Sequence, residues 1–218
     1  SFQIMEDVRK NRPLKEAQLE VMKSHGVPDW YIDSCIKIQY MFPRAHAVAY
    51  VMMSFRMAWY KVYYPREFYA TYFTSVVQDF DADTILKGPD AILEKIDLIK
   101  AKGQAATAKE GSEIIVLEVA YEMYARGYRF SNIDIDLSEA TDFKVMPGDN
   151  KTIIPPFTTV DGLGENVAKS IVEARKSCPF LSKEDILTRT QLSGTLLKKL
   201  EKLGCLNHLQ DENQMSLF

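Results

Sequence analysis

Two glycines two residues apart precede a helix-like stretch in the segment TTVDGLGENVAKSIVEAR. Gly162 and Gly164 bracket Leu163, and glycine tolerates the positive φ angle and bare backbone of a tight hairpin. The first N–H groups of the following helix would point outward, which suits a DNA phosphate better than a base edge. The segment therefore predicts a DNA-binding hairpin formed by Gly162, Leu163, Gly164, Glu165, Asn166 and Lys169.

This glycine pair lacks the third glycine and the preceding Val/Ile strand of a dinucleotide-binding loop. The alternative to DNA binding is a helix-turn-helix that serves only packing. A degraded second copy follows in TRTQLSGTLLKKLEKLGCL, which keeps the helix and the pair Lys198 and Lys199. Its Leu192-Ser193-Gly194 echoes the hairpin only loosely.

A second group of candidate residues lies in YMFPRAHAVAY. Arg44 and His46 flank the start of a long apolar helix, so a guanidinium, an imidazole and helix N–H groups converge at one point. A triphosphate is the natural ligand for such a point, and Phe42 and Tyr50 would offer flat surfaces for a base. On these residues alone, a solvated arginine beside a half-buried histidine is the favoured interpretation.

The third group is the apolar end of DENQMSLF, which follows a polar run. Such a segment has the build of a short binding motif, in which a glutamine hydrogen-bonds and Leu-Phe fills an apolar pocket on a partner. The alternative is that Leu217 and Phe218 fold back onto their own domain. The candidate peptide comprises Gln214, Met215, Ser216, Leu217 and Phe218.

Composition limits the other classes of site. The 218 residues are 46% hydrophobic, with three widely spaced cysteines, no CxxC and three histidines, so we expect reduced thiols, a cytosolic protein and no metal site. The most apolar run, 47–55, is too short to span a bilayer. The Asp-x-Asp pairs at 81–83 and 134–136 are interpreted as solvated faces or caps, and no catalytic residue is predicted.

Charge divides the chain into three zones. Lys and Arg number 10 against 7 acids in 1–78, 9 against 15 in 79–154 and 8 against 8 in 155–218. A net charge of −3 argues against a protein that simply coats nucleic acid. A basic first part, an acidic middle and a neutral last part indicate separate functional zones. The chain does not begin with Met, and we expect a fragment of a longer protein.

Helical periodicity and proline positions define the elements that must position these residues. Helices are predicted after Pro156 and over 15–26, 28–42, 46–64, 66–77, 89–102 and 112–126. The helix over 46–64 is apolar nearly all round, so we expect it at the centre of a core. Short strands are predicted in IDIDL, ATDFKV and KTIIP, with the turn PGDN between the last two. The fold class is mainly α with a small β element.

Taken in order, these segments resemble one family over essentially the whole chain. The stretch from YIDSCIKIQYMFPRAHAVAY to YPREFYATYFT resembles the fingers of the PolC-type (Gram-positive) bacterial DNA polymerase III alpha subunit. SFQIMEDVRK, LEVAYEMYARGYRFSNIDI, LGENVAKSIVEAR, FLSKEDI and QMSLF extend the resemblance. Ala45 departs from the serine of the wider family, which leaves the neighbouring cation and imidazole in place.

The resemblance implies a C-terminal portion of such a polymerase with four parts. They are fingers helices facing the nucleotide (1–78), an acidic helical and β connector of the fingers (79–154), a tandem helix-hairpin-helix domain for duplex DNA (155–209) and a flexible tail with a clamp-binding motif (210–218). Contact with the incoming nucleotide becomes the favoured role for Arg44 and His46. The second hairpin's departure from the family pattern puts its DNA contact in doubt.

The resemblance also implies the partners and the division of labour. The partners would be primer-template DNA, an incoming deoxynucleoside triphosphate, a sliding clamp and the remaining palm and other polymerase domains, in the cytoplasm at the nucleoid. Mg²⁺ would be bound by palm carboxylates outside this chain, so the 218 residues alone should not catalyse. The rival interpretations are a non-enzymatic helix-hairpin-helix DNA-binding adaptor and a fragment of a DNA-repair enzyme.

Overall fold

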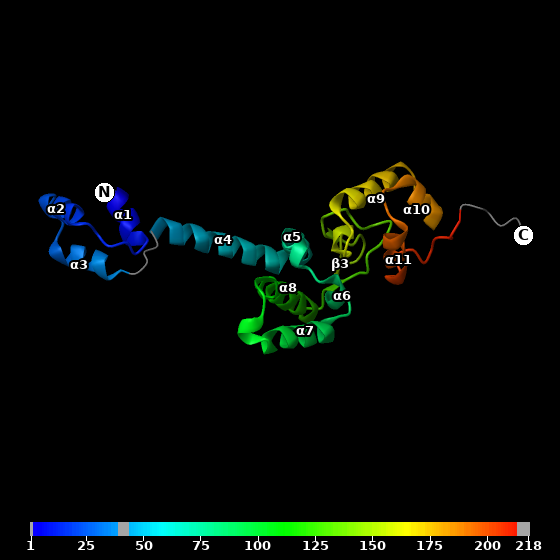
Figure 1. Ribbon diagram of the computed structural model, residues 1–218, viewed down its shortest axis with the longest axis horizontal. Coiled ribbons are helices and arrows are strands. Elements are labelled where there is room, and N and C mark those ends of the chain that lie inside the picture. Colours follow the sequence, from blue (N-terminus) through cyan, green and yellow to red (C-terminus); the bar gives the residue numbers. More distant parts are fainter. Residues whose placement is uncertain (1, 39–43, 213–218) are drawn as a thin grey trace, which may run out of the picture. The chain divides into compact units, whose positions relative to one another are not determined.

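The computed structural model describes residues 2–38 and 44–212. The chain divides into two compact units, Ser1–Ala58 and Trp59–Phe218. Most of the described residues are helical, and one small sheet lies in the second unit, as predicted (Figure 1).

The first unit contains three short helices, α1 (Phe2–Arg9), α2 (Glu16–Ser24) and α3 (Asp29–Lys37). Each contributes one buried apolar residue, and these are Val8, Met22 and Ile32. Gly26 has a φ of 71°, which turns the chain after α2. The helix predicted over 28–42 ends at Lys37, and residues 39–43 lie outside the described ranges.

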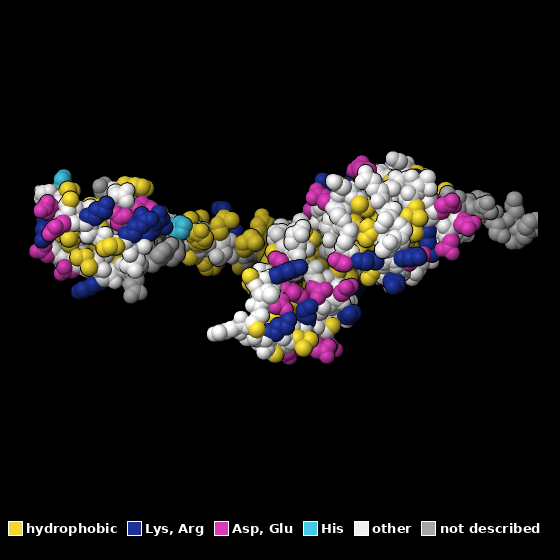
Figure 2. Space-filling model, in the orientation of Figure 1, with side chains coloured by type: hydrophobic (Ala, Val, Ile, Leu, Met, Phe, Trp, Pro, Cys, Tyr) yellow, Lys and Arg dark blue, Asp and Glu magenta, His cyan; other side chains and the backbone are white. Residues whose placement is uncertain are grey.

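Helix α4 (Arg44–Tyr63) corrects one prediction from the sequence. We expected its apolar surface at the centre of a core, but none of its side chains is buried, and Val51, Phe55 and Trp59 are each about half exposed or more (Figure 2). A helix that is apolar all round needs neighbours on every side, and the described residues do not bury it. An exposed apolar surface of this length indicates an interaction surface.

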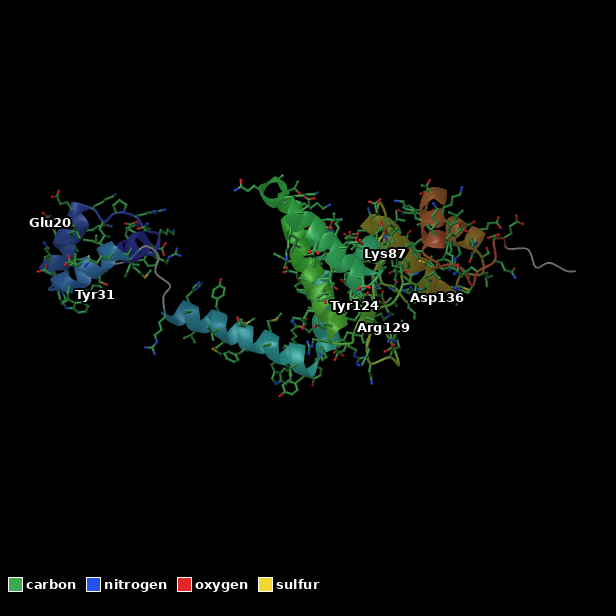
Figure 3. The ribbon with its side chains drawn as sticks, turned by 90° about the horizontal axis from the view of Figure 1, so that it is seen from below. Glu20, Tyr31, Lys87, Tyr124, Arg129 and Asp136 are labelled. Atoms are coloured by element: carbon green, nitrogen blue, oxygen red, sulfur yellow. The ribbon has the colours of Figure 1, made fainter. Side chains whose placement is uncertain are left out.

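The first core of the second unit gathers around aromatic side chains. It is built by α5 (Pro65–Ser75), η1 (Val77–Asp79), α6 (Ala82–Ile85), α7 (Pro89–Ala101), η2 (Gly103–Ala105) and α8 (Ala108–Ala125). Tyr69 and Phe73 are fully buried, and Phe73 contacts Phe80, Phe130 and Phe143 edge-on or at a tilt. Tyr124, labelled in Figure 3, donates a hydrogen bond from α8 to the carbonyl of Ile85 at 2.9 Å.

Sequence signals for α7 and α8 are confirmed, with one shifted boundary. Helix α7 begins at Pro89, as predicted, and Gly127 follows α8 with a φ of 79°. Helix α8 begins four residues before the predicted start. The reason is a capping box, in which Thr107 accepts from the Glu110 N–H and the Glu110 carboxylate accepts from the Thr107 N–H.

The sheet has the order β1-β3-β2, formed by β1 (Arg129–Phe130), β2 (Lys144–Val145) and β3 (Thr152–Ile154). Strand β1 runs parallel to β3, and β2 runs antiparallel to β3. Strands were predicted in ATDFKV and KTIIP and are confirmed there, whereas the strand in IDIDL is wrong. The Asp134 carboxylate accepts hydrogen bonds from the N–H groups of Asp136 and Leu137, which makes a turn of that segment.

A second core carries the hairpins, formed by η3 (Phe157–Thr159), α9 (Glu165–Ser177), α10 (Lys183–Arg189) and α11 (Gly194–Lys202). Phe157, Ile171, Ile186 and Leu200 are fully buried in it. Two further members come from upstream of residue 155, namely Ile133 and Ile135. Arg175 on α9 donates a hydrogen bond to the Ile135 carbonyl at 2.9 Å, so this core begins well before the predicted domain start.

Candidate nucleic-acid interface

The predicted hairpin forms the turn between η3 and α9. Gly162 has a φ of 81°, which favours glycine, and Leu163 is only 3% exposed because it packs into the second core. Gly164 is the residue before the first turn of α9, in extended conformation. Leucine thus anchors the turn from within, while the two glycines present backbone on its outer side.

The amino-terminal end of α9 has no cap from its own side chains. Gly164 has no side chain that could accept from the first N–H groups of the helix. These N–H groups and the helix dipole attract an anion, and a phosphate oxygen is a suitable acceptor. The structure therefore brings together the predicted residues Gly162, Leu163, Gly164, Glu165 and Asn166 at one end of α9.

Lys169, the sixth predicted residue, lies one turn along α9. Its ammonium pairs with the Glu165 carboxylate at 2.6 Å, and this hydrogen bond raises the pKa of Lys169. Both side chains are well exposed. An exposed pair of this kind has little net stability, so Lys169 can exchange Glu165 for another anion at small cost.

The second hairpin closes on itself. Ser193 is the residue before the first turn of α11, and its hydroxyl accepts a hydrogen bond from the Leu196 N–H at 3.3 Å. The Thr190 hydroxyl accepts from the Leu192 N–H at 3.1 Å, and none of the described residues 190–194 has a positive φ. At α11, therefore, a hydroxyl of the chain accepts from a helix N–H group, whereas no side chain caps the start of α9.

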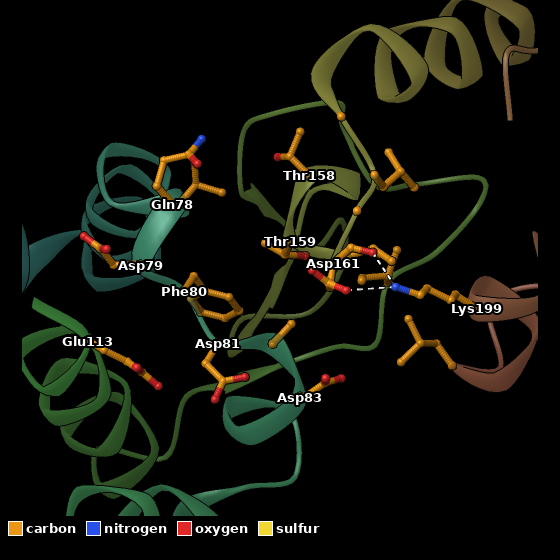
Figure 4. A pocket seen from close by; sticks show the side chains of 18 of the residues that line it. Gln78, Asp79, Phe80, Asp81, Asp83, Glu113, Thr158, Thr159, Asp161 and Lys199 are labelled. Carbon is orange, nitrogen blue, oxygen red and sulfur yellow. Dashed lines mark hydrogen bonds and ion pairs between the residues drawn. The ribbon is translucent and has the colours of Figure 1, made fainter. Parts of the chain in front are cut away.

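The two hairpins are joined by Lys199 of α11. Its ammonium donates to the carbonyl of Asp161 at 2.8 Å and to the Asp161 carboxylate at 2.9 Å, as Figure 4 shows. The hydrogen bond from Lys199, with its charge, lowers the pKa of Asp161. A Cβ atom built on Gly162 would lie 3.8 Å from the Lys199 Nζ, so this cation stands directly beside the turn.

The hairpin borders a cleft of about 890 Å³ whose opposite wall is formed by the segment 77–83 (Figure 4). Four lysines line it, namely Lys95, Lys109, Lys199 and Lys202. Asp81 caps α6 by accepting from the Thr84 N–H, and Lys95 lies 3.5 Å from Asp81 and 3.2 Å from Glu113. Burial disfavours the Lys95 ammonium, yet these two carboxylates raise its pKa.

The candidate nucleotide-contacting residues lie at the beginning of α4. Arg44 is the first residue of the helix, His46 lies in its first turn and Tyr50 follows one turn later. The rings of His46 and Tyr50 are 4.5 Å apart at 63°. Phe42 lies outside the described residues. The structure thus groups three of the four predicted residues, whose role stays a prediction.

The candidate clamp-binding peptide, Gln214–Phe218, lies outside the described residues. The chain just before it is held in place, because the N–H groups of Lys183 and Glu184 donate to the carbonyls of Gln210 and Asp211. Lys183 also pairs with the Asp211 carboxylate at 2.6 Å. The part of the predicted tail that the structure describes is therefore bound to the start of α10.

The acidic pairs act locally. Asp134 and Asp81 accept hydrogen bonds in a turn and at a helix start, which confirms their interpretation as caps. Among residues 2–38 and 44–212, no group of three or more His, Cys, Asp or Glu side chains is arranged to hold a metal ion. No described helix is both long and apolar enough to cross a membrane.

Sequence reasoning missed two features of this interface. Asp161 was not singled out, although it adjoins Gly162, and its partner Lys199 is 38 positions away, so no spacing rule connects them. The tie between Arg175 and Ile135 was also missed. Both features depend on how distant segments pack, and a local pattern carries no signal for that.

Comparison with known proteins agrees with this geometry. A family model described as "Helix-hairpin-helix motif" matches residues 127–215. The "DNA polymerase III PolC-type" proteins of Oceanobacillus iheyensis and Bacillus subtilis are each 50% identical to the chain, and that of Caldanaerobacter subterraneus subsp. tengcongensis is 49% identical. Each match covers all 218 residues here but only 15% of the relative. The chain therefore belongs to the DNA polymerase III PolC-type family and corresponds to one segment of its longer proteins.

Proposed function

We propose that this segment serves a DNA-directed DNA polymerase by holding the backbone of primer-template duplex at the hairpin 162–166. The observation that carries the proposal is the bare start of α9 beneath Gly162 and Gly164. Backbone N–H groups contact phosphates without regard to base sequence, which suits an enzyme that must copy any template. The likeness to polymerases over the full chain supports this choice over an adaptor or a repair enzyme.

The first turn of α4 is proposed to contact the triphosphate of the incoming nucleotide. Arg44 would supply a permanent charge and His46 a hydrogen-bond donor, at the amino-terminal end of a 20-residue helix whose dipole favours anions. Tyr50 would offer its ring to the base, together with Phe42. This part of the proposal rests on residue types and on their grouping within two turns.

The remaining partners follow from the proposed polymerase. Gln214–Phe218 would dock into a sliding clamp, and its tie to a DNA-bound protein would raise the effective concentration of a weak peptide. Other domains of the polymerase would cover the exposed apolar surface of α4. Mg²⁺ would be held by palm carboxylates outside this chain, and the parent protein would work in the cytoplasm.

The hairpin proposal is tested by duplex binding. Gly162→Val places a β-branched side chain at a φ of 81° and should weaken duplex affinity at least tenfold. For the unchanged chain, the logarithm of the affinity should fall steeply with the logarithm of salt concentration, by about 0.9 per phosphate. Anisotropy of a labelled duplex measures both. Unchanged affinity in a variant with native circular dichroism would exclude the hairpin as the site.

Two further assays separate the rivals. The 218 residues alone should not extend a primer, and robust extension would contradict the proposed division of labour. Photo-cross-linking of a nucleoside triphosphate should be lost in Arg44→Ala and in His46→Ala, whereas an adaptor should not cross-link at all.

A further inference from the structure

We propose that the Asp161 carboxylate takes the place of a DNA phosphate in the free protein. It binds Lys199 beside the hairpin until the duplex displaces it. The inference rests on the proposed function and adds two residues to it: Lys199 as a further phosphate-binding cation and Asp161 as its counter-charge in the free protein. It gives the second hairpin a share in DNA binding through its helix instead of through its turn.

The two hydrogen bonds of Lys199 have different character. The carbonyl of Asp161 belongs to the backbone of the turn, so this bond at 2.8 Å fixes the ammonium beside Gly162. The carboxylate bond at 2.9 Å is made by a side chain that is 92% exposed and free to rotate away. Since an ammonium has three donors, it can stay anchored to the carbonyl while it changes its anionic partner.

The position of the carboxylate suits this exchange. A phosphate bound at the start of α9 would come close to Lys199, which lies 3.8 Å from the Cβ position of Gly162. The Asp161 carboxylate would then lie next to a second anion. Like charges at that distance repel. The Asp161 side chain must therefore rotate away from Lys199, because its charge would otherwise weaken DNA binding.

Lys199 loses little free energy when it leaves Asp161, and it gains more when it binds a DNA phosphate. An exposed ion pair contributes little free energy, because water and salt screen both groups. A phosphate of duplex DNA instead releases condensed counterions when a lysine neutralises it. The free protein thus keeps the lysine oriented at the hairpin, and the duplex gains one more contact.

The test measures duplex affinity of the full chain against salt concentration for Asp161→Asn, Lys199→Gln and the double variant. Asp161→Asn should tighten binding about three- to tenfold and steepen the salt slope by up to about 0.9, the value for one phosphate. Lys199→Gln should weaken binding and make the slope shallower by a similar amount. In the Lys199→Gln background, Asp161→Asn should tighten binding clearly less than in the unchanged chain, because only the repulsion between Asp161 and phosphate is then relieved and no lysine is released.

Glu173→Gln is the matched control. It removes the same charge and releases Lys176 from an exposed pair at 2.8 Å, but it lies nine residues beyond Gly164 on α9, about 13 Å along the helix. Its affinity should stay within about twofold of the unchanged chain. Equal tightening by Glu173→Gln and Asp161→Asn would overturn the inference, since both would then act only through net charge.

Two other results would also overturn it. Weaker binding by a folded Asp161→Asn would mean that the carboxylate supports the hairpin, and an undiminished effect in the Lys199→Gln background would mean that Asp161 acts without the lysine. If Gly162→Val leaves affinity unchanged, the proposed function fails and the inference with it. If Gly162→Val weakens binding but Asp161→Asn does not tighten it, the inference alone fails.

Discussion

The two hairpins of the second core differ in what lies at the start of the helix that each one leads into. At α9 the position is Gly164, without a side chain, after a turn whose φ of 81° requires glycine. At α11 it is Ser193, whose hydroxyl binds the helix's own N–H group. A single hydroxyl group therefore decides whether an N–H group at the start of the helix is bound within the chain or is left open to an external acceptor.

The degraded hairpin still contributes to the intact one. Lys199 of α11 reaches the turn before α9, so the second copy supports the first through its helix. In the proposed function, the first copy supplies the DNA-binding turn and the second copy supports it within the same core.

The largest effect is expected from matched glycine substitutions. Gly162→Ala should weaken duplex affinity about tenfold, because alanine is strained at a positive φ and the turn must shift. Gly194→Ala, at the first position of α11, meets open space at an ordinary φ and should change affinity less than twofold. Anisotropy titrations of both variants measure the contrast, and equal losses would show that the hairpins are equivalent.

An intermediate effect is expected when the α11 arrangement is copied onto α9. Gly164→Ser would place a hydroxyl where Ser193 has one, in space that holds no other atom within 4 Å of the new Cβ. The serine should weaken duplex affinity about threefold, because it competes with phosphate for the same N–H groups, while it raises helix stability by several tenths of a kcal/mol. Calorimetry measures the expected gain in stability, and anisotropy on the same preparation measures the expected loss of duplex affinity.

Ser193→Ala is the reciprocal control. It should lower the free energy of unfolding by about 1 kcal/mol, because α11 loses its cap, with duplex affinity within twofold of the unchanged chain. If Ser193→Ala remains folded and its duplex affinity falls more than twofold, the second turn contacts DNA.

The smallest effect is expected from pH. Because Lys199 lowers the pKa of Asp161, the carboxylate is ionised well above that pKa and loses its charge only as pH falls through it, below the ordinary value of 3.8. The affinity ratio between Asp161→Asn and the unchanged chain should therefore be constant from pH 5 to pH 8. A ratio that changes in this window would assign the effect to another titrating group.

Local signals predicted the hairpin, and non-local packing decided what they missed. The need for glycine at a positive φ is set within four residues, so the pattern around Gly162 was sufficient. Proline and capping signals likewise predicted the beginnings of α7 and the end of α8. The alternation of IDIDL failed because its aspartates hydrogen-bond to nearby backbone and favour a turn.

Burial could not be predicted in the same way. The composition of α4 predicted a core position, yet burial depends on neighbours, and the described chain does not surround it. Pro155 and Pro156 are both buried, and their burial likewise depends on neighbours in space. The partnership between Asp161 and Lys199 crosses 38 residues, so only the fold reveals it.

The path of the chain between the two cores has a mechanical consequence. Phe130 belongs to the first core and Ile133 to the second, and Ile153 and Phe157 make the same crossing a second time. The two crossings are joined, because the Ser131 N–H donates to the Ile153 carbonyl at 2.9 Å. The first core and the hairpins are therefore connected by two paired crossings of the chain and belong to one compact unit, so we expect them to resist separation more than a single linker would allow.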